Sequence, residues 1–166
     1  MKEFDYKFFE NPDALINSVD VVSIITPTIS HFKIAEKAIK ASKHLFIEKP
    51  IAQTDDEANT LVNLAIDYKV LGQVGHVERF NPAYQSIKST LINPMFIEAH
   101  RLAEFNPRGT DVSVILDLMI HDIDIILSVV DSPIRRIDAS GVAVISKTPD
   151  ICNCLLYTSD AADELC

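Results

Sequence analysis

A lysine held between a glutamate and a proline is the first candidate for chemistry in this sequence. Glu48-Lys49-Pro50 follows the apolar run at residues 44–47, which predicts a short buried strand. Proline cannot donate to a sheet ladder, and it favours an extended conformation at the residue before it. We therefore expect the Lys49 ammonium group just beyond a strand end, at the carboxyl edge of a sheet, where open α/β folds bind ligands.

A polar stripe on an otherwise apolar segment is the second candidate. Asp117, His121, Asp124 and Ser128 would share one face of a helix predicted over residues 111–130. Periodicity alone favours the solvent-facing side of a surface helix. The alternative is a stripe that faces a polar cleft, where an imidazole can act as a base and a carboxylate one turn away can orient it.

The segments around Lys49 alternate between strand and helix patterns. Apolar runs predict strands at residues 19–25, 44–47 and 70–74. Helical spacing predicts helices at residues 30–42 and 55–68, the second with Thr54 as its N-cap and Glu57 as its capping-box partner. This alternation is typical of a parallel, doubly wound sheet.

The pattern changes at Gly75, where we expect a domain boundary. Beyond it the sequence predicts a helix at 83–91, a strand at 95–102, a turn at 106–109, the long helix, and a strand at 134–145.

Four motifs occur in an order that resembles one enzyme family. They are Thr26-Pro27-x3-His31, Glu48-Lys49-Pro50, Gly75-His76-Val77-Glu78-Arg79-Phe80-Asn81-Pro82 and Asp117-x3-His121-Asp122. Together they resemble the glucose–fructose oxidoreductase / inositol dehydrogenase family (Gfo/Idh/MocA) of NAD(P)-dependent enzymes, over residues 4–145. The last two motifs look most like the branch that oxidises C3 of UDP-N-acetylglucosamine.

The resemblance implies a fold class and a reaction. The fold would be α/β: the second half of a Rossmann-type doubly wound parallel sheet in residues 1–74, then the start of an α+β substrate domain in residues 75–151. The full-length parent would transfer hydride between a sugar, nucleotide-sugar or cyclitol hydroxyl and the nicotinamide of NAD or NADP. Lys49 would hydrogen-bond the reacting hydroxyl, His121 would be the base, and Asp117 would orient His121 or bind substrate.

The resemblance also implies binding roles, for which structural alternatives stay open. The cofactor would contact Thr26, Pro27, His31, Glu48 and Lys49, and the substrate would contact His76, Arg79 and Asn81. His31 could instead be a polar residue in a first helical turn, and His76 and Arg79 could form a structural ion pair. Glu48 could support Lys49 electrostatically instead of binding the cofactor ribose.

The glycines limit how much of that family's fold we expect. The sequence has four, the first of them Gly72, so it carries no glycine-rich phosphate turn. We therefore expect an inactive fragment that lacks the first βαβ unit. Residues 152–166 resemble a peptide translated from sequencing-adapter DNA, and we expect a non-native tail there. Cys152 and Cys154 receive little weight as a metal site, and no metal is expected.

The composition argues against several other classes of protein. A net charge of −9 argues against nucleic-acid binding, which depends on basic residues that neutralise phosphates. No apolar stretch approaches the ~18 residues of a membrane span, and the amino terminus shows no signal-peptide pattern. We expect a cytoplasmic protein with a small sugar substrate and a homo-oligomeric parent. A sugar-binding homologue without turnover and a non-functional translated fragment stay open as alternatives.

Overall fold

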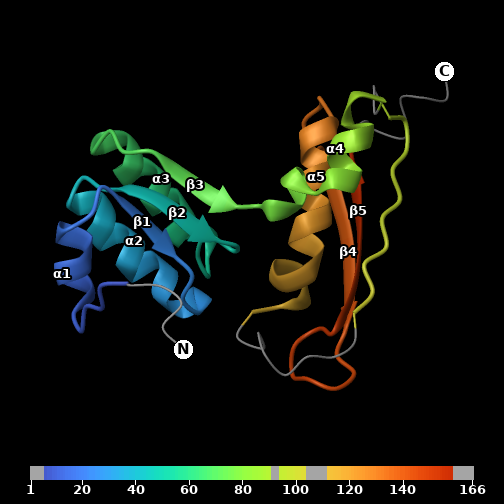
Figure 1. Cartoon of the computed structure of the whole chain (residues 1–166). Helices are drawn as coiled ribbons and strands as arrows, with labels where there is room; N and C mark the ends of the chain where they lie inside the picture. Colours follow the sequence, from blue (N-terminus) through green and yellow to red (C-terminus); the bar gives the residue numbers. More distant parts are fainter. Residues whose placement is uncertain (1–5, 91–93, 104–111, 159–166) are drawn as a thin grey trace. The chain divides into compact units, whose positions relative to one another are not determined.

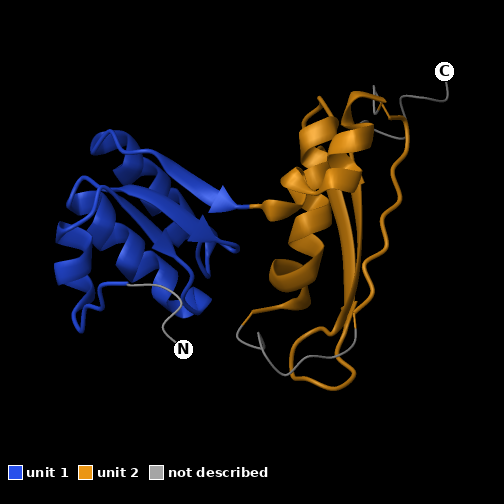
Figure 2. Ribbon diagram, in the orientation of Figure 1, with its two compact units in different colours: residues 1–75 blue, residues 76–166 orange. Residues whose placement is uncertain are grey.

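The structure is a computed structural model that describes residues 6–90, 94–103 and 112–158 (Figure 1). The chain divides into two compact units, Met1–Gly75 and His76–Cys166 (Figure 2). A three-stranded sheet belongs to the first unit and a two-stranded sheet to the second. The turn predicted at residues 106–109 and the last part of the predicted tail, residues 159–166, lie outside the described residues.

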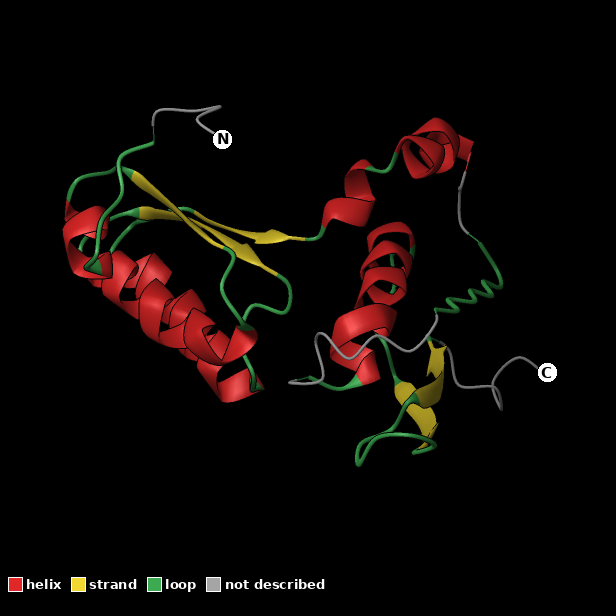
Figure 3. Ribbon diagram, turned by 60° about the horizontal axis from the view of Figure 1, so that its bottom comes forward, coloured by secondary structure: helices red, strands yellow, loops and turns green. Residues whose placement is uncertain are grey.

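The first unit is a parallel sheet whose strands are connected by helices, as predicted. Its elements are α1 (Pro12–Asn17), β1 (Val21–Ile24), the 3-10 turn η1 (Thr28–Ser30), α2 (His31–Lys40), β2 (His44–Glu48), α3 (Asp55–Asp67) and β3 (Gly72–Gly75). The strand order is β1-β2-β3, and both pairings are parallel. Both crossover helices lie on the same side of the sheet (Figure 3), which is the outcome when each crossover is right-handed.

The core of this unit lies between the sheet and its helices. Burial alternates along β1 and β2, so that Val22, Ile24, Leu45 and Ile47 are buried while Val21 is 57% exposed. The buried strand residues form one cluster with Ile16, Ala35, Ala38, Ile39, Leu61 and Val70. Each fully buried Ile, Leu or Val side chain contributes roughly 1.5–3 kcal/mol. This packing holds the strand ends, and the loops that follow them, in place.

Helix α3 starts at the predicted N-cap and is followed by a residue with a left-handed backbone conformation. The hydroxyl of Thr54 accepts from the Glu57 N–H at 3.2 Å, so the predicted N-cap is confirmed. At the other end, Lys69 N donates to Ile66 O and Val70 N donates to Ala65 O. This is the Schellman motif, and its left-handed position, usually glycine, is Lys69 with φ 55°. Ser42 takes the same position after α2, with φ 58°.

The second unit contains a long helix and a β-hairpin. Its elements are the 3-10 turn η2 (Val77–Phe80), α4 (Pro82–Ile87), the 3-10 turn η3 (Lys88–Thr90), the π-helical turn η4 (Ile115–Met119), α5 (Ile120–Val129), β4 (Arg136–Val142) and β5 (Ile151–Tyr157). β4 and β5 are antiparallel over seven residue pairs.

Three features of the second unit differ from the sequence-based expectations. Residues 95–102, predicted as a strand, run in an extended path that joins neither sheet of the described chain (Figure 1). The predicted long helix contains a π-helical turn instead of being α-helical throughout. Strand β5 was not predicted, because its residues fall mostly in the expected tail. That residues 152–166 are foreign to the protein stays a prediction.

Within the ranges that the structure describes, no helix has both the length and the hydropathy that a membrane span requires.

Candidate functional site

The carboxyl ends of the three parallel strands gather the predicted cofactor residues of the first unit. Thr26-Pro27 comes just after β1, Glu48 ends β2 and is followed by Lys49-Pro50, and Gly75 ends β3. The parallel register pairs Ile24 with Ile47 and Glu48 with Gly75, so the strand ends lie side by side. This edge is where open α/β sheets bind ligands.

The Glu48 carboxylate lies close to a glycine on the neighbouring strand. A Cβ atom at Gly75 would lie 3.1 Å from the Oε2 atom of Glu48, so a larger residue there would require the carboxylate to shift by a few tenths of an ångström. The same oxygen accepts from the backbone N–H of Lys49 at 3.3 Å. The peptide bond between Lys49 and Pro50 is cis. Glu48 therefore supports the backbone of Lys49, while its contact with a cofactor ribose stays a prediction.

His31 lies inside the first unit, below the loops that it was expected to line. It is 1% exposed, and its Nδ1 and Nε2 atoms lie 2.9 Å from Pro50 O and 2.8 Å from Thr26 O. We expected His31 to contact the cofactor. In this structure both ring nitrogens face backbone carbonyls of the two loops, and contact of His31 with the cofactor stays a prediction.

Asp117 and His121 lie on the continuous helix of the second unit, in the π-helical turn and at the start of α5. Ile120 N donates to Ile115 O, five residues back, which defines the π turn. In an α-helix, residues four apart overshoot a full turn by about 40°. A π turn rotates each residue less, so Asp117 and His121 stand more nearly one above the other. Such turns are frequent at functional sites.

Arg79 forms an ion pair with the polar stripe. Its Nε and Nη2 atoms donate to the Asp124 carboxylate at 2.6 and 2.7 Å, and hydrogen bonding to Asp124 raises the pKa of Arg79. The Nδ1 atom of His76 lies 3.7 Å from the same carboxylate. Asp124 is 8% exposed. Arg79 therefore forms an ion pair, His76 lies near the same carboxylate, and contact of either residue with substrate stays a prediction.

Asn81 has a local structural task. Its Oδ1 atom accepts from Ala83 N at 3.0 Å and so caps α4, while its Nδ2 atom donates to Glu78 at 2.9 Å. We expected Asn81 to bind substrate, whereas both ends of its amide are used within the η2–α4 segment.

Two contacts that the sequence did not reveal account for more of the helix's polar residues. Arg101 donates to Asp122 at 2.9 and 2.8 Å, and hydrogen bonding to Asp122 raises the pKa of Arg101. Tyr84 OH lies 2.9 Å from the Ser128 hydroxyl, which donates to Ile125 O. No spacing in the sequence links these pairs. In the carboxyl-terminal half of the stripe, Asp124 is thus buried against Arg79, whereas Ser128 is exposed and contacts Tyr84 of α4.

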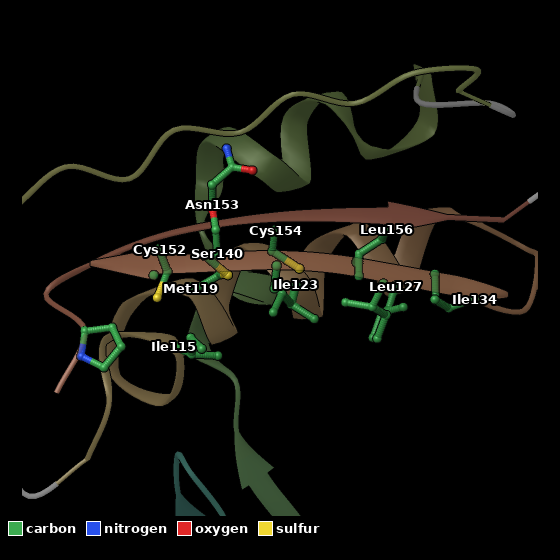
Figure 4. A pocket seen from close by; sticks show the side chains of 14 residues that line it. Ile115, Met119, Ile123, Leu127, Ile134, Ser140, Cys152, Asn153, Cys154 and Leu156 are labelled. Atoms are coloured by element: carbon green, nitrogen blue, oxygen red, sulfur yellow. The ribbon is translucent and has the colours of Figure 1, made fainter. Parts of the chain in front are cut away.

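An apolar cavity of roughly 430 Å³ lies between the helix and the hairpin (Figure 4). Ile115, Met119, Ile123 and Leu127 line it from the helix, and Cys152 and Cys154 line it from β5. Its walls offer too few polar groups to orient a sugar. Within the described part of the chain, no group of three or more His, Cys, Asp or Glu side chains is placed to hold a metal ion.

Comparisons with known proteins agree with this geometry. Residues 1–76 match the oxidoreductase family with an NAD-binding Rossmann fold. UDP-N-acetylglucosamine 3-dehydrogenase from Acidithiobacillus ferrooxidans is 39% identical over 150 residues, which cover 90% of this chain and 48% of that protein. The solved structure of that enzyme has a TM-score of 0.84, with 38% identity, over 90% of this chain and 50% of its own.

A more distant relative is an enzyme of cyclitols. The scyllo-inositol 2-dehydrogenase (NAD(+)) of Bacillus subtilis is 26% identical over 84% of this chain and 42% of its own length. The chain thus spans about half the length of the curated relatives it matches. The parallel sheet, the motifs at its carboxyl edge and these matches lead to one conclusion: the chain belongs to the Gfo/Idh/MocA family of oxidoreductases, and residues 1–76 carry its NAD-binding Rossmann fold.

Proposed function

We propose that the whole protein is an NAD(P)-dependent dehydrogenase that oxidises a secondary hydroxyl of a sugar, with a nucleotide-sugar as the favoured class. The observation that carries this proposal is the placement of Lys49 at the carboxyl edge of the sheet, between Glu48 and Pro50. The favoured substrate class follows from the name of the relative with 39% identity.

The residues at the sheet edge fit one part of a dinucleotide. The Thr26-Pro27 loop and the Glu48-Lys49 segment offer backbone and side-chain groups beside each other at the ends of β1 and β2. The pyrophosphate would need other donors, because no glycine occurs before residue 72.

The nicotinamide, when bound, supplies the hydride acceptor. Lys49 would donate a hydrogen bond to the reacting hydroxyl oxygen and stabilise the negative charge that develops there. His121 would accept the hydroxyl proton, and Asp117 would orient the imidazole or bind the sugar.

A hybrid enzyme tests the proposal. In it, the aligned 150 residues of this chain would replace their counterparts in the Acidithiobacillus enzyme. Lys49→Ala should lower kcat by ~10²–10³, as the loss of an oxyanion donor does. Lys33→Ala, which removes an exposed lysine of α2, is the matched control and should leave kcat unchanged. Near-native turnover of the Lys49→Ala hybrid would refute the proposal.

A further inference from the structure

His31 is unusual among the residues of the first unit because it is an ionisable side chain buried as completely as the aliphatic core. Only Ile24 and Ile39 are comparably large and enclosed in the described chain. Burying a polar ring without partners costs free energy. Carbonyl oxygens lie 2.9 Å from Nδ1 and 2.8 Å from Nε2, so the N–H group of the ring has an acceptor in either tautomer and the penalty is reduced. A singly protonated ring donates to one of these carbonyls, and a doubly protonated ring donates to both.

The two carbonyls belong to the loops that follow two neighbouring strands. Thr26 lies two residues beyond the end of β1, and Pro50 lies two residues beyond the end of β2. These carbonyls point inward to His31, so the opposite side of each loop is presented at the carboxyl edge. One side chain at the start of α2 therefore sets the separation of the two loops.

Lys49 is fixed on both sides by this arrangement. On one side, Glu48 is in the β2–β3 ladder opposite Gly75. On the other side, the Pro50 carbonyl is held by His31. The backbone of Lys49 has little freedom left between these two anchors.

We propose that His31 is a positioning residue for Lys49 and for the Thr26-Pro27 loop. It acts through their backbone and does not touch substrate or cofactor. This inference rests on the proposed function, in which Lys49 contacts the reacting hydroxyl. Because a misplacement of about 1 Å can cost a factor of ~10² in rate, loss of the His31 ring and its carbonyl contacts should lower kcat without removing any reacting group.

Hydrogen exchange of the full chain tests the structural half of the inference. In His31→Ala, amides of residues 25–30 and 49–53 should exchange at least about tenfold faster, relative to amides of β2, than in the parent chain. Ile39→Ala is the matched control, because Ile39 is 1% exposed on the same helix and lies away from the sheet edge. It should not raise the exchange of these two loops above that of β2. Equal loop exchange in the two variants would overturn the inference.

Kinetics of the hybrid enzyme test the catalytic half. Per folded molecule, His31→Ala should lower kcat by about 10- to 100-fold, and Ile39→Ala should leave it near the parent value. His31→Gln, which keeps a donor for one carbonyl, should recover part of the loss. If Lys49→Ala abolishes turnover while His31→Ala behaves like Ile39→Ala, the positioning role is refuted and the proposed function stands. If Lys49→Ala keeps turnover, the proposed function itself fails.

Discussion

The ion pair between Arg79 and Asp124 should respond unequally to the removal of its two members. The Asp124 side chain is 9% exposed and that of Arg79 is 49% exposed. Arg79→Met leaves a buried carboxylate without its two donors, and breaking a fully buried pair in this way costs about 3–5 kcal/mol. Since Arg79 is half-exposed, we expect about 2–4 kcal/mol. Asp124→Asn leaves a guanidinium that can turn to water, and should cost about 1 kcal/mol.

Hydrogen exchange of α5 amides in the full chain measures both losses. A factor of ten in exchange corresponds to about 1.4 kcal/mol. Arg79→Met should therefore accelerate exchange by roughly 30- to 700-fold, and Asp124→Asn by about fivefold. In the double variant, Arg79→Met should cost much less than it does alone, because the residue at position 124 no longer carries a charge.

The pair between Arg101 and Asp122 is a control within the same unit. Their side chains are 32% and 23% exposed, so neither partner is much more buried than the other. Arg101→Met and Asp122→Asn should therefore have similar costs. Equal costs at Arg79 and Asp124, or a larger cost for Asp124→Asn, would refute the argument from burial.

Three further predictions concern the helix, a helix end and a loop. In the hybrid enzyme, Asp117→Ala and His121→Ala should each cut kcat/KM severely, and the double variant should be little worse than the poorer single one; small, additive losses would contradict the catalytic assignment. Lys69→Gly should raise the free energy of unfolding by about 1 kcal/mol, measured by urea denaturation, because φ is 55° there. Lys33→Gly, at the third residue of α2, should instead lower it. Hydrogen bonds from the Ser146 side chain and from the N–H groups of the preceding loop lower the pKa of Asp150. The contribution of Asp150 to stability is therefore present above its unfolded-state pKa of about 3.9 and is lost as the pH falls through its folded-state pKa. The difference in urea midpoint between the parent chain and Asp150→Asn should therefore shrink on acidification, and a constant difference would contradict this.

The first unit was predictable because its local signals agree with one another. Alternating apolar residues specify the strands, Thr54 specifies the start of α3, and Pro50 ends the strand segment before it. These signals act over a few residues, so they can be recognised in the sequence. The strand bounds differ from the predicted ones by one to two residues at most ends, as expected when burial decides where pairing stops.

The second unit was harder to predict because its organisation depends on contacts between distant residues. Residues 95–102 have strand-like composition, but a strand also needs a partner, and the sheets of the described chain do not include this segment. The pairing of Arg79 with Asp124 spans 45 positions. The π turn at Ile115–Met119 has no periodicity of its own within a segment that is apolar on almost every side.

The candidate site was predictable in its residue types and less so in their roles. The motif order located Lys49, Asp117 and His121 on a strand end and a helix, as the structure places them. Burial was the missing information for His31, because a histidine at a helix start has the same sequence pattern whether its ring faces outward or inward. The ring is 1% exposed, and from that value we infer a supporting role.

The close approach between Glu48 and Gly75 has an evolutionary consequence. A methyl group at position 75 would lie 3.1 Å from the Glu48 carboxylate, which would have to shift by a few tenths of an ångström, so we expect substitutions at the two positions to be coupled. Among homologous sequences, we expect alanine or serine at position 75 to occur mainly together with a shorter residue at position 48. An alignment would show this as covariation between the end of β2 and the last residue of the first unit, two positions that are adjacent in the sheet and 27 apart in the chain.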